Sequence, residues 1–218
     1  MSKTAIVIGA TGVTGRPLVD ALLEHNAYQK VLVFSRRDLQ IDHAKLVVQV
    51  VDFDDIDSWA AEIVGDELFS AMGTTMKQAG SKQAQYKVDF SYQANVIAAA
   101  AQNGVPRLFL VSSPSASSRS LLFYPRIKGE LEDFAAEQTI SQRVVFRPSL
   151  IVGDRPDGRL GEKLAVQMVN MVPDVLFLKK RYQPITGEQL AQAMVNSANT
   201  DIGDQHRIYE LEQIFKLL

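Results

Sequence analysis

Short apolar runs alternate along this chain with longer segments in which apolar residues recur every three or four positions. The run Thr4–Ile8 is almost continuously apolar, which is typical of a parallel strand buried on both faces. In the segment that follows, Leu18, Val19, Leu22 and Leu23 have the spacing of one helix face. The chain is therefore predicted to begin with a β-strand, a turn and an α-helix.

The alternation of strand and helix continues to about residue 150. Further strands are predicted at Lys30–Phe34, Leu46–Val51, Leu68–Met72, Arg107–Val111 and Val144–Arg147. Further helices are predicted at Ser58–Val64, Gln83–Asn103 and Tyr124–Gln138. This alternation predicts an α/β protein with a doubly wound parallel sheet. Ligands of such sheets bind at the carboxyl ends of the strands, where the strand order reverses.

After Pro148 the pattern changes. Gly153–Gly161 combines charged residues, glycines and a proline, so it is predicted to be a loop. Later elements are predicted as helices at Leu164–Met171 and Gly187–Ala198, and as a strand and short helix within Arg207–Leu218. We expect residues 1–150 to form a nucleotide-binding core. Residues 151–218 are expected to form a small C-terminal substrate cap, integrated with the core in one structural domain.

Composition excludes several classes of protein. The 218 residues carry a formal net charge of -2, which argues against general binding to nucleic acid or to membrane surfaces. Cysteine is absent, which excludes disulfides and thiolate nucleophiles, and the three scattered histidines do not suggest a metal site. We see no basic leader with an apolar core and no apolar run of the ~18 residues that a membrane helix needs. These features predict a cytoplasmic protein.

A glycine-rich turn joins the first predicted strand to the first predicted helix. It reads Gly9-Ala10-Thr11-Gly12-Val13-Thr14-Gly15, a G-x-x-G-x-x-G spacing. In this context one glycine permits the tight turn, one lets the backbone approach a pyrophosphate, and one lets helix and strand pack closely. The helix start offers unpaired N–H groups to the phosphates. The predicted phosphate-binding residues are Gly9, Thr11, Gly12, Val13, Thr14 and Gly15. The alternative is a glycine turn without a ligand.

Residues after the second predicted strand bear on the choice between NAD and NADP. An acidic residue about 20 positions after the glycine turn holds the ribose 2′-hydroxyl of NAD in such folds. Here Ser35, Arg36 and Arg37 stand at that place. A guanidinium matches the geometry of a phosphate, so the pair predicts NADP(H). Asp38 is the competing residue, because a shifted loop would bring its carboxylate to the ribose, and a solvated charge cluster is the other explanation.

Two further loops lie at the same predicted edge of the sheet. Asp52 and Phe53 follow the third strand, where the adenine would lie. Gly73, Thr74 and Thr75 follow the fourth strand and are expected beside the nicotinamide ribose and phosphates. Both loops are included in the predicted cofactor site.

Tyr124 and Lys128 are the candidate catalytic pair. They lie four residues apart at the start of a predicted helix, so their side chains share one face. A nearby ammonium favours the phenolate and lowers the pKa of a tyrosine, which then exchanges a proton with a carbonyl or alcohol oxygen. The lysine can also hold the ribose hydroxyls of the cofactor. The alternative is a surface pair without a catalytic role.

Serines follow the fifth predicted strand. Either Ser112 or Ser113 could donate a hydrogen bond to the substrate oxygen, and Ser113 is preferred. Serines also end strands without any such function. The loop Ser112–Ser120 contains six serines among nine residues.

Together these residues resemble the atypical and extended short-chain dehydrogenase/reductase superfamily. The features that carry the resemblance are the glycine turn, Leu-Val-Ser-Ser ending at Ser113, Tyr124-x-x-x-Lys128 and Arg147-Pro148. The short cap, Gly73-Thr74-Thr75 with Ala79-Gly80 beyond it, and Tyr124 through Gly129-Glu130 are most similar to the Tat-interacting-protein branch and its bacterial relatives.

The resemblance implies a Rossmann-like NADP(H)-binding protein. It implies Tyr124 as the acid/base, Lys128 as its partner, Ser113 as substrate donor, and Pro148 as a packing contact near the nicotinamide. One position departs from the pattern, because Asp89 stands where many extended members carry a structural asparagine. This departure puts a water-mediated proton relay through Lys128 in doubt.

Two functions are compatible with these residues. The first is an NADP(H)-dependent oxidoreductase acting on an unknown small carbonyl or alcohol substrate. The alternative is a non-catalytic NADP(H)-binding protein that reports redox state to a partner. The sequence leaves open whether the protein is a monomer or a homodimer.

Overall fold

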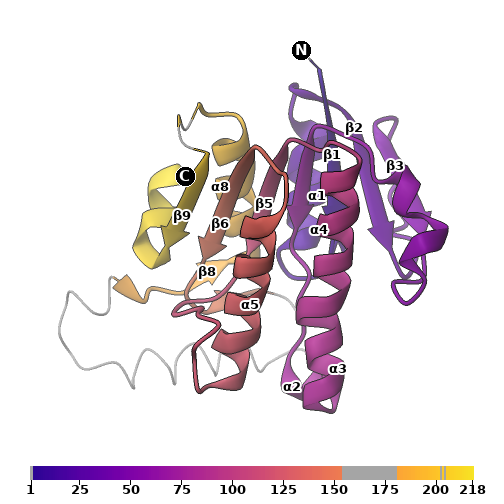
Figure 1. Cartoon of the computed structure of the whole chain (residues 1–218). Coiled ribbons are helices and arrows are strands. Elements are labelled where there is room, and N and C mark those ends of the chain that lie inside the picture. Colours follow the sequence, from indigo (N-terminus) through magenta and orange to yellow (C-terminus); the bar gives the residue numbers. More distant parts are fainter. Residues whose placement is uncertain (1, 154–180, 202, 204) are drawn as a thin grey trace.

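A seven-stranded parallel sheet forms the centre of the computed structural model, which describes residues 2–153, 181–201, 203 and 205–218 (Figure 1). The strands are, in sheet order, β3 (Leu46–Val50), β2 (Tyr28–Ser35), β1 (Lys3–Ile8), β4 (Glu67–Ser70), β5 (Arg107–Val111), β6 (Gln142–Arg147) and β9 (His206–Glu210). Every neighbouring pair is parallel. The order reverses between β1 and β4, so the predicted doubly wound, Rossmann-like sheet is confirmed.

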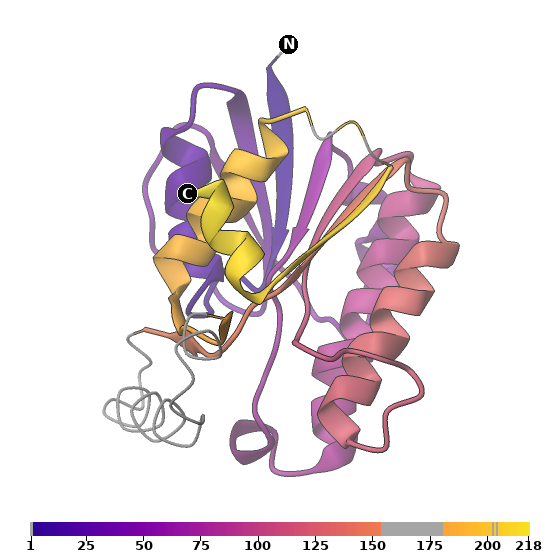
Figure 2. The ribbon, with the colours of Figure 1, turned by 90° about the vertical axis from the view of Figure 1, so that its left-hand side faces the viewer.

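Helices cover both faces of the sheet. Helices α1 (Gly15–Glu24) and α8 (Gly187–Ala198) lie on one face, and α4 (Tyr92–Gln102) and α5 (Phe123–Glu137) lie on the other (Figure 2). Strand β1 shows the reason, because successive side chains of a strand point to opposite faces. Its Ala5 and Val7 belong to the core beneath α1 and α8, whereas Ile6 and Ile8 belong to the core beneath α4. All four are fully buried, which explains the unbroken apolar run.

Two predicted helices differ from the structure. In place of the helix at Ser58–Val64 there are two 3₁₀ turns, Ile56–Ser58 and Ala60–Glu62. Trp59 interrupts the segment because its ring stacks on Phe34, 4.9 Å between centroids, and its indole N–H donates to a backbone carbonyl. This tertiary contact overrides the local helical pattern.

The predicted helix at Gln83–Asn103 is a helical run with a wider turn inside it. It comprises α3 (Lys82–Tyr86), a π turn at Lys87–Ser91 and α4. A further short helix, α2 (Met76–Ala79), lies in the segment predicted as a loop after β4. Its N-terminus is capped by the Thr75 hydroxyl, which accepts the N–H of Gln78.

The C-terminal segment contributes to the sheet and its helix layer. Strand β9 pairs with β6, and α8 packs beside α1 (Figure 2). A small parallel pair, β7 (Ile151–Val152) and β8 (Ile185–Thr186), precedes α8, and a 3₁₀ helix at Leu211–Leu217 ends the chain. The predicted helix at Leu164–Met171 lies outside the described residues. A boundary between core and cap at residue 150 stays a prediction.

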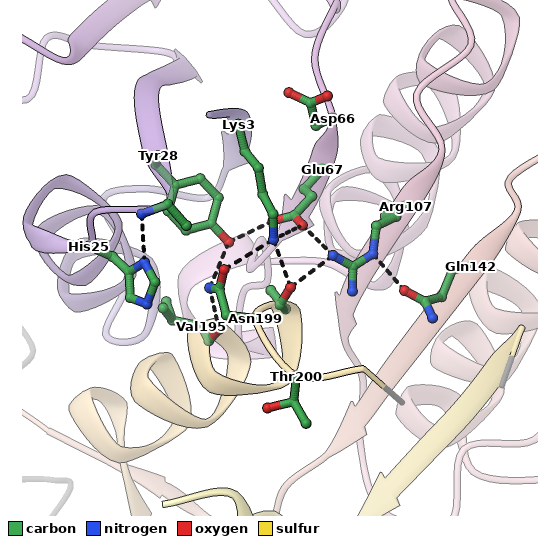
Figure 3. Close-up of polar contacts among 12 residues, drawn as sticks. Lys3, His25, Tyr28, Asp66, Glu67, Arg107, Gln142, Val195, Asn199 and Thr200 are labelled. Atoms are coloured by element: carbon green, nitrogen blue, oxygen red, sulfur yellow. Dashed lines mark hydrogen bonds and ion pairs between the residues drawn. The ribbon is translucent and has the colours of Figure 1, made fainter. Parts of the chain in front are cut away.

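A buried charge cluster ties the amino ends of the strands together (Figure 3). Glu67 is fully buried and accepts from Lys3 Nζ at 2.9 Å, from the Tyr28 hydroxyl at 2.6 Å and from Arg107. Lys3 and Arg107 also donate to the carbonyl of Ala198 at the end of α8. Burial, followed by the charge of Glu67, raises the pKa of the Tyr28 phenol far above its usual value, so it remains a donor. The cluster therefore lies at the amino ends of the strands, whereas the glycine turn follows the carboxyl end of β1.

Candidate cofactor and catalytic site

The glycine turn lies at the switch point between β1 and β4. Gly9 follows β1 with a φ of 82°, a conformation that favours glycine. A Cβ on Gly9 would lie 2.5 Å from the backbone carbon of Ala71 and the nitrogen of Met72. The turn is therefore pressed against the backbone that leaves β4, and no larger residue fits.

The other two glycines of the turn have different surroundings. A Cβ on Gly15 would lie 2.0 Å from the carbonyl oxygen of Gly9, so this residue lets α1 start directly against the turn. A Cβ on Gly12 would lie 3.2 Å from the same oxygen and 3.9 Å from the carbonyl oxygen of Ala71. The surroundings of Gly12 are thus the more open, which fits backbone that a ligand approaches.

The start of α1 has the donors that a pyrophosphate needs. Thr14 is the N-cap residue, yet its hydroxyl makes no capping bond, is buried and has no hydrogen-bond partner among the described residues. The first turn of the helix contains no acidic side chain. A buried hydroxyl without a partner and a helix N-terminus together suit an anion. The opposite side of the turn is closed, because a Cβ on Gly187 would lie 1.9 Å from the carbonyl oxygen of Val13.

Two arginines extend from the end of β2. Ser35 is the last residue of the strand and is buried, whereas Arg36 and Arg37 are exposed. Within the described part of the chain, no side chain pairs with either guanidinium. Asp38 is also exposed, and its carboxylate accepts the N–H of Gln40, 3.2 Å away. The guanidinium groups of Arg36 and Arg37 are therefore available to a ligand at the carboxyl end of β2. The competing carboxylate of Asp38 already accepts a hydrogen bond within its own turn.

The two predicted residues of the loop after β3 differ in burial. Phe53 is 3% exposed, and its ring contacts those of Trp59 and Tyr92 at 5.3 and 5.5 Å. Asp52 is exposed, and its carboxylate accepts the N–H of Asp54. The ring of Phe53 therefore belongs to the core, and Asp52 is the exposed residue of the two.

Helix α5 carries both members of the predicted catalytic pair. Tyr124 is 39% exposed, whereas Lys128, one turn further along, is 2% exposed. Lys128 Nζ lies 3.8 Å from Asp89 Oδ1. Burial lowers the pKa of Lys128, and the charges of Asp89 and then Glu132 oppose that shift.

Asp89 connects Lys128 with the loop after β4. It is fully buried, and its Oδ2 accepts the N–H of Thr74 over 3.2 Å. A Cβ on Gly73 would lie 3.3 Å from Asp89 Oδ1. Burial raises the pKa of Asp89, and the Lys128 charge opposes that shift. The structure thus brings Asp89, Lys128 and the Gly73–Thr75 loop together.

The two serines after β5 have different partners. The Ser112 hydroxyl donates to Glu132, and the Ser112 N–H donates to the carbonyl of Phe146 over 2.7 Å. The Ser113 hydroxyl is buried and has no hydrogen-bond partner among the described residues. Ser113 is therefore the serine with a hydroxyl available to a ligand.

Glu132 and Gly129 are residues of the site that sequence reasoning missed. Glu132 binds Arg147 through contacts of 3.0 and 2.6 Å, which fixes the strand end before the buried Pro148. A Cβ on Gly129 would lie 2.2 Å from the backbone of Ser117, so the serine loop packs directly on α5. The spacing of Glu132 from Lys128, again four residues, was the available signal.

Residues 2–153, 181–201, 203 and 205–218 contain no group of three acidic or histidine side chains suited to a metal ion. None of the helices in those same ranges has the length and apolarity to span a membrane.

Comparison with known proteins identifies relatives by sequence. A family model described as NAD(P)H-binding matches residues 9–150. Protein FMP52, mitochondrial, from Candida glabrata is 34% identical over 209 residues, which cover 91% of this chain and 86% of that protein. Protein HTATIP2 from Rattus norvegicus is 32% identical over 177 residues, which cover 79% of this chain and 73% of that protein.

Solved structures share the fold at low sequence identity. The enzyme WbmH from Bordetella bronchiseptica, in complex with NAD+, has a TM-score of 0.71 at 18% identity, covering 96% of this chain and 76% of that one. A UDP-galactose 4-epimerase has a TM-score of 0.69 at 20% identity, covering 95% and 76%.

The predicted cytoplasmic location is contradicted by these relatives. The FMP52 proteins of Candida glabrata, Eremothecium gossypii and Debaryomyces hansenii, each matched over at least 90% of this chain, are named mitochondrial. The prediction rested on the absence of an obvious leader and of a membrane-length apolar run. Neither absence specifies a compartment, which explains the error.

Proposed function

This chain belongs to the NAD(P)H-binding family of the short-chain dehydrogenase/reductase superfamily, and on that premise we propose that it is an NADP(H)-dependent oxidoreductase acting on a small carbonyl or alcohol compound. One observation carries the proposal. A buried lysine, Lys128, stands one helical turn from Tyr124, and the free hydroxyl of Ser113 lies at the end of the neighbouring strand.

The proposal divides the binding work among three segments. The turn Gly9–Gly15 and the start of α1 hold the pyrophosphate through backbone N–H groups and the Thr14 hydroxyl. Arg36 and Arg37 hold the 2′-phosphate. The Gly73–Thr75 loop and Pro148 border the nicotinamide end, where the cofactor supplies or accepts a hydride when bound.

The chemical work belongs to the chain's own side chains. Ser113 donates a hydrogen bond to the substrate oxygen and orients it. Tyr124 gives a proton to that oxygen during reduction and takes one during oxidation. Lys128, held as an ammonium, stabilises the phenolate of Tyr124. The proposed substrate is a small carbonyl or alcohol compound, which a screen of such compounds would identify.

The test is turnover with a panel of carbonyl and alcohol compounds, using absorbance of the reduced cofactor as the readout. We expect at least one compound to be converted with NADPH or NADP+, and binding of NADPH to be measurable without substrate. Tight NADPH binding without turnover on any compound would favour the alternative function, a redox-reporting protein.

Cofactor preference is tested at the arginine pair. We expect Arg36→Ala or Arg37→Ala to weaken NADPH binding by about 1.5–3 kcal/mol, roughly 10- to 150-fold, because a charged contact to the 2′-phosphate is lost. Binding of NADH, which lacks that phosphate, should not change. Fluorescence titration with both nucleotides measures the two constants, and equal losses for both would contradict the assignment.

The glycine turn allows a matched pair of substitutions. A Cβ on Gly12 would lie 3.2 Å from its nearest neighbour, the carbonyl oxygen of Gly9, so we expect Gly12→Ala to fold. We expect it to bind NADPH at least tenfold more weakly, a loss of about 1.4 kcal/mol. Gly15→Ala places a methyl group inside the contact distance to Gly9, so we expect a loss of about 3 kcal/mol or more in unfolding free energy. Thermal unfolding and nucleotide titration of both variants separate the two effects. Unchanged NADPH binding by folded Gly12→Ala would contradict the predicted site.

A further inference from the structure

A chain of buried polar groups links β4 to Lys128. Ser70, Gln93 and Asp89 are fully buried, and Lys128 is nearly so. The Ser70 hydroxyl donates to Gln93 Oε1 over 2.7 Å, and Gln93 Nε2 donates to the backbone carbonyl of Asp89 over 2.9 Å. The Asp89 carboxylate faces Lys128. Buried polar groups cost free energy unless each is matched, so a chain of four must hold its members in a defined arrangement.

Asp89 reaches this position through the π turn at Lys87–Ser91. A π turn widens the helix and is frequent at functional sites. Gln93 donates to two carbonyls of this turn, those of Asp89 and of Val88 at 3.4 Å. Gln93 therefore holds the π turn through these hydrogen bonds. Gln93 is itself hydrogen-bonded to Ser70 at the end of β4.

The Asp89 carboxylate has one satisfied oxygen and one that is not. Oδ2 accepts the N–H of Thr74, whereas Oδ1 has no hydrogen-bond partner within the described residues. Oδ1 is the atom that lies 3.8 Å from Lys128 Nζ. The Lys128 charge is the largest influence that lowers the pKa of Asp89, followed by the Thr74 N–H and the Gln85 side chain.

Two carboxylates act on Lys128 in the described part of the chain, Asp89 from the π turn and Glu132 from its own helix. Glu132 is already bound by the guanidinium of Arg147 and by the hydroxyl of Ser112. No other lysine or arginine of the described residues pairs with Asp89. Among the described residues, Asp89 is therefore the carboxylate that pairs with Lys128 and with no other cation.

We propose that Asp89 is a positioning residue whose carboxylate keeps Lys128 protonated inside the protein, and that Ser70 and Gln93 hold this carboxylate in place. The carboxylate acts on the reaction through Lys128 and then Tyr124. The aspartate at position 89 thereby sets the pH range in which Tyr124 is active as acid and base.

The sign of the effect follows from burial. Burial lowers the pKa of Lys128, and the charge of Asp89 is the largest opposing influence. A neutral residue at position 89 leaves burial opposed by Glu132 alone, so Lys128 loses its proton at lower pH. A neutral lysine does not stabilise the Tyr124 phenolate, so the pKa of Tyr124 rises. A lysine that kept its proton would give the opposite sign, because a negative charge near Tyr124 has been removed.

The experiment measures the pKa of Tyr124 directly. Tyrosinate absorbance of the full-length protein is titrated with pH, and the same titration of Tyr124→Phe is subtracted. We expect Asp89→Asn to raise the Tyr124 pKa by about one unit or more. The control Asp133→Asn removes an exposed carboxylate from α5, the helix that carries Tyr124. It should leave the pKa of Tyr124 unchanged. An unchanged or lowered pKa in Asp89→Asn overturns the proposal.

Two further variants guard against a purely structural effect. Gln93→Met removes the anchor of the π turn and keeps both charges, so we expect a smaller rise of the Tyr124 pKa. In the Lys128→Arg background the guanidinium stays charged without a counter-ion, so Asp89→Asn should no longer raise that pKa. A rise of equal size in the arginine background would contradict an action through Lys128. Thermal unfolding of each variant confirms that the protein titrated is folded.

This inference rests on the proposed role of Tyr124, and the titration separates the two. A Tyr124 pKa near the ordinary value of about 10 in the unmodified protein would contradict the proposed Tyr124–Lys128 pair itself. A lowered pKa that Asp89→Asn does not change would leave that pair intact and overturn only the role of Asp89.

Discussion

Replacement of Tyr124 by phenylalanine is expected to lower turnover on any active substrate by roughly 10²- to 10⁴-fold, the usual contribution of a positioned acid/base group. The ring remains and only the hydroxyl is lost, so nucleotide contacts should persist. NADPH affinity should therefore stay within about twofold, or about 0.4 kcal/mol, of that of the unmodified protein. Initial rates at saturating NADPH, together with fluorescence titration of NADPH alone, measure both quantities.

A matched control is available on strand β9. Tyr209→Phe removes a hydroxyl from a ring that stacks on Phe146, at 5.8 Å between centroids, outside the proposed site. Its turnover should be unchanged. Full activity of Tyr124→Phe on a substrate that the protein converts would show that another group transfers the proton.

Replacement of Glu67 by alanine is expected to lower the free energy of unfolding by about 3–5 kcal/mol, because removing one partner of a buried ion pair leaves the others uncompensated. Glu67 is fully buried and bound by Lys3, Tyr28 and Arg107 (Figure 3). The loss should appear as a shift of the midpoint in urea unfolding. Because the cluster lies at the edge opposite the glycine turn, NADPH binding by the folded fraction should be unchanged.

Two other variants locate the origin of that loss. Glu62→Ala removes an exposed carboxylate close by in the sequence and should change stability by no more than about 0.5 kcal/mol. Glu67→Gln keeps the side-chain volume and an acceptor for Tyr28 but not the charge, so its stability should lie between those of Glu67→Ala and the unmodified protein. A loss below about 1 kcal/mol for Glu67→Ala would mean that the cluster is not needed for folding.

Sequence patterns predicted the strands well because burial on both faces leaves an unbroken apolar run. The run Thr4–Ile8 is an example, since its alternate residues enter two different cores. The same patterns failed at Ser58–Val64, because the ring of Trp59 is drawn onto Phe34 of β2. Local propensity has no access to a contact between residues that are 25 positions apart.

The candidate site divides in the same way. The Gly9–Gly15 turn, the Tyr124/Lys128 spacing and the arginines after β2 are local features, so they could be read from sequence. The choice between Ser112 and Ser113 was not local, because it depends on Glu132 of α5 engaging one hydroxyl and leaving the other free. The compartment was predicted wrongly, since it is specified by neither composition nor apolar runs.

By itself, the sequence determined the parallel doubly wound sheet, the position of the glycine turn in it and the side chains that follow each strand. These depend on periodicity and on backbone space, which are properties of short segments. Only the tertiary structure decided which of those side chains meet. Asp89 was an unexplained departure in sequence, and folding places its carboxylate 3.8 Å from Lys128 across two helices. The physical reason is that charge compensation in a protein interior is set by distance in space and by burial, neither of which the order of residues specifies.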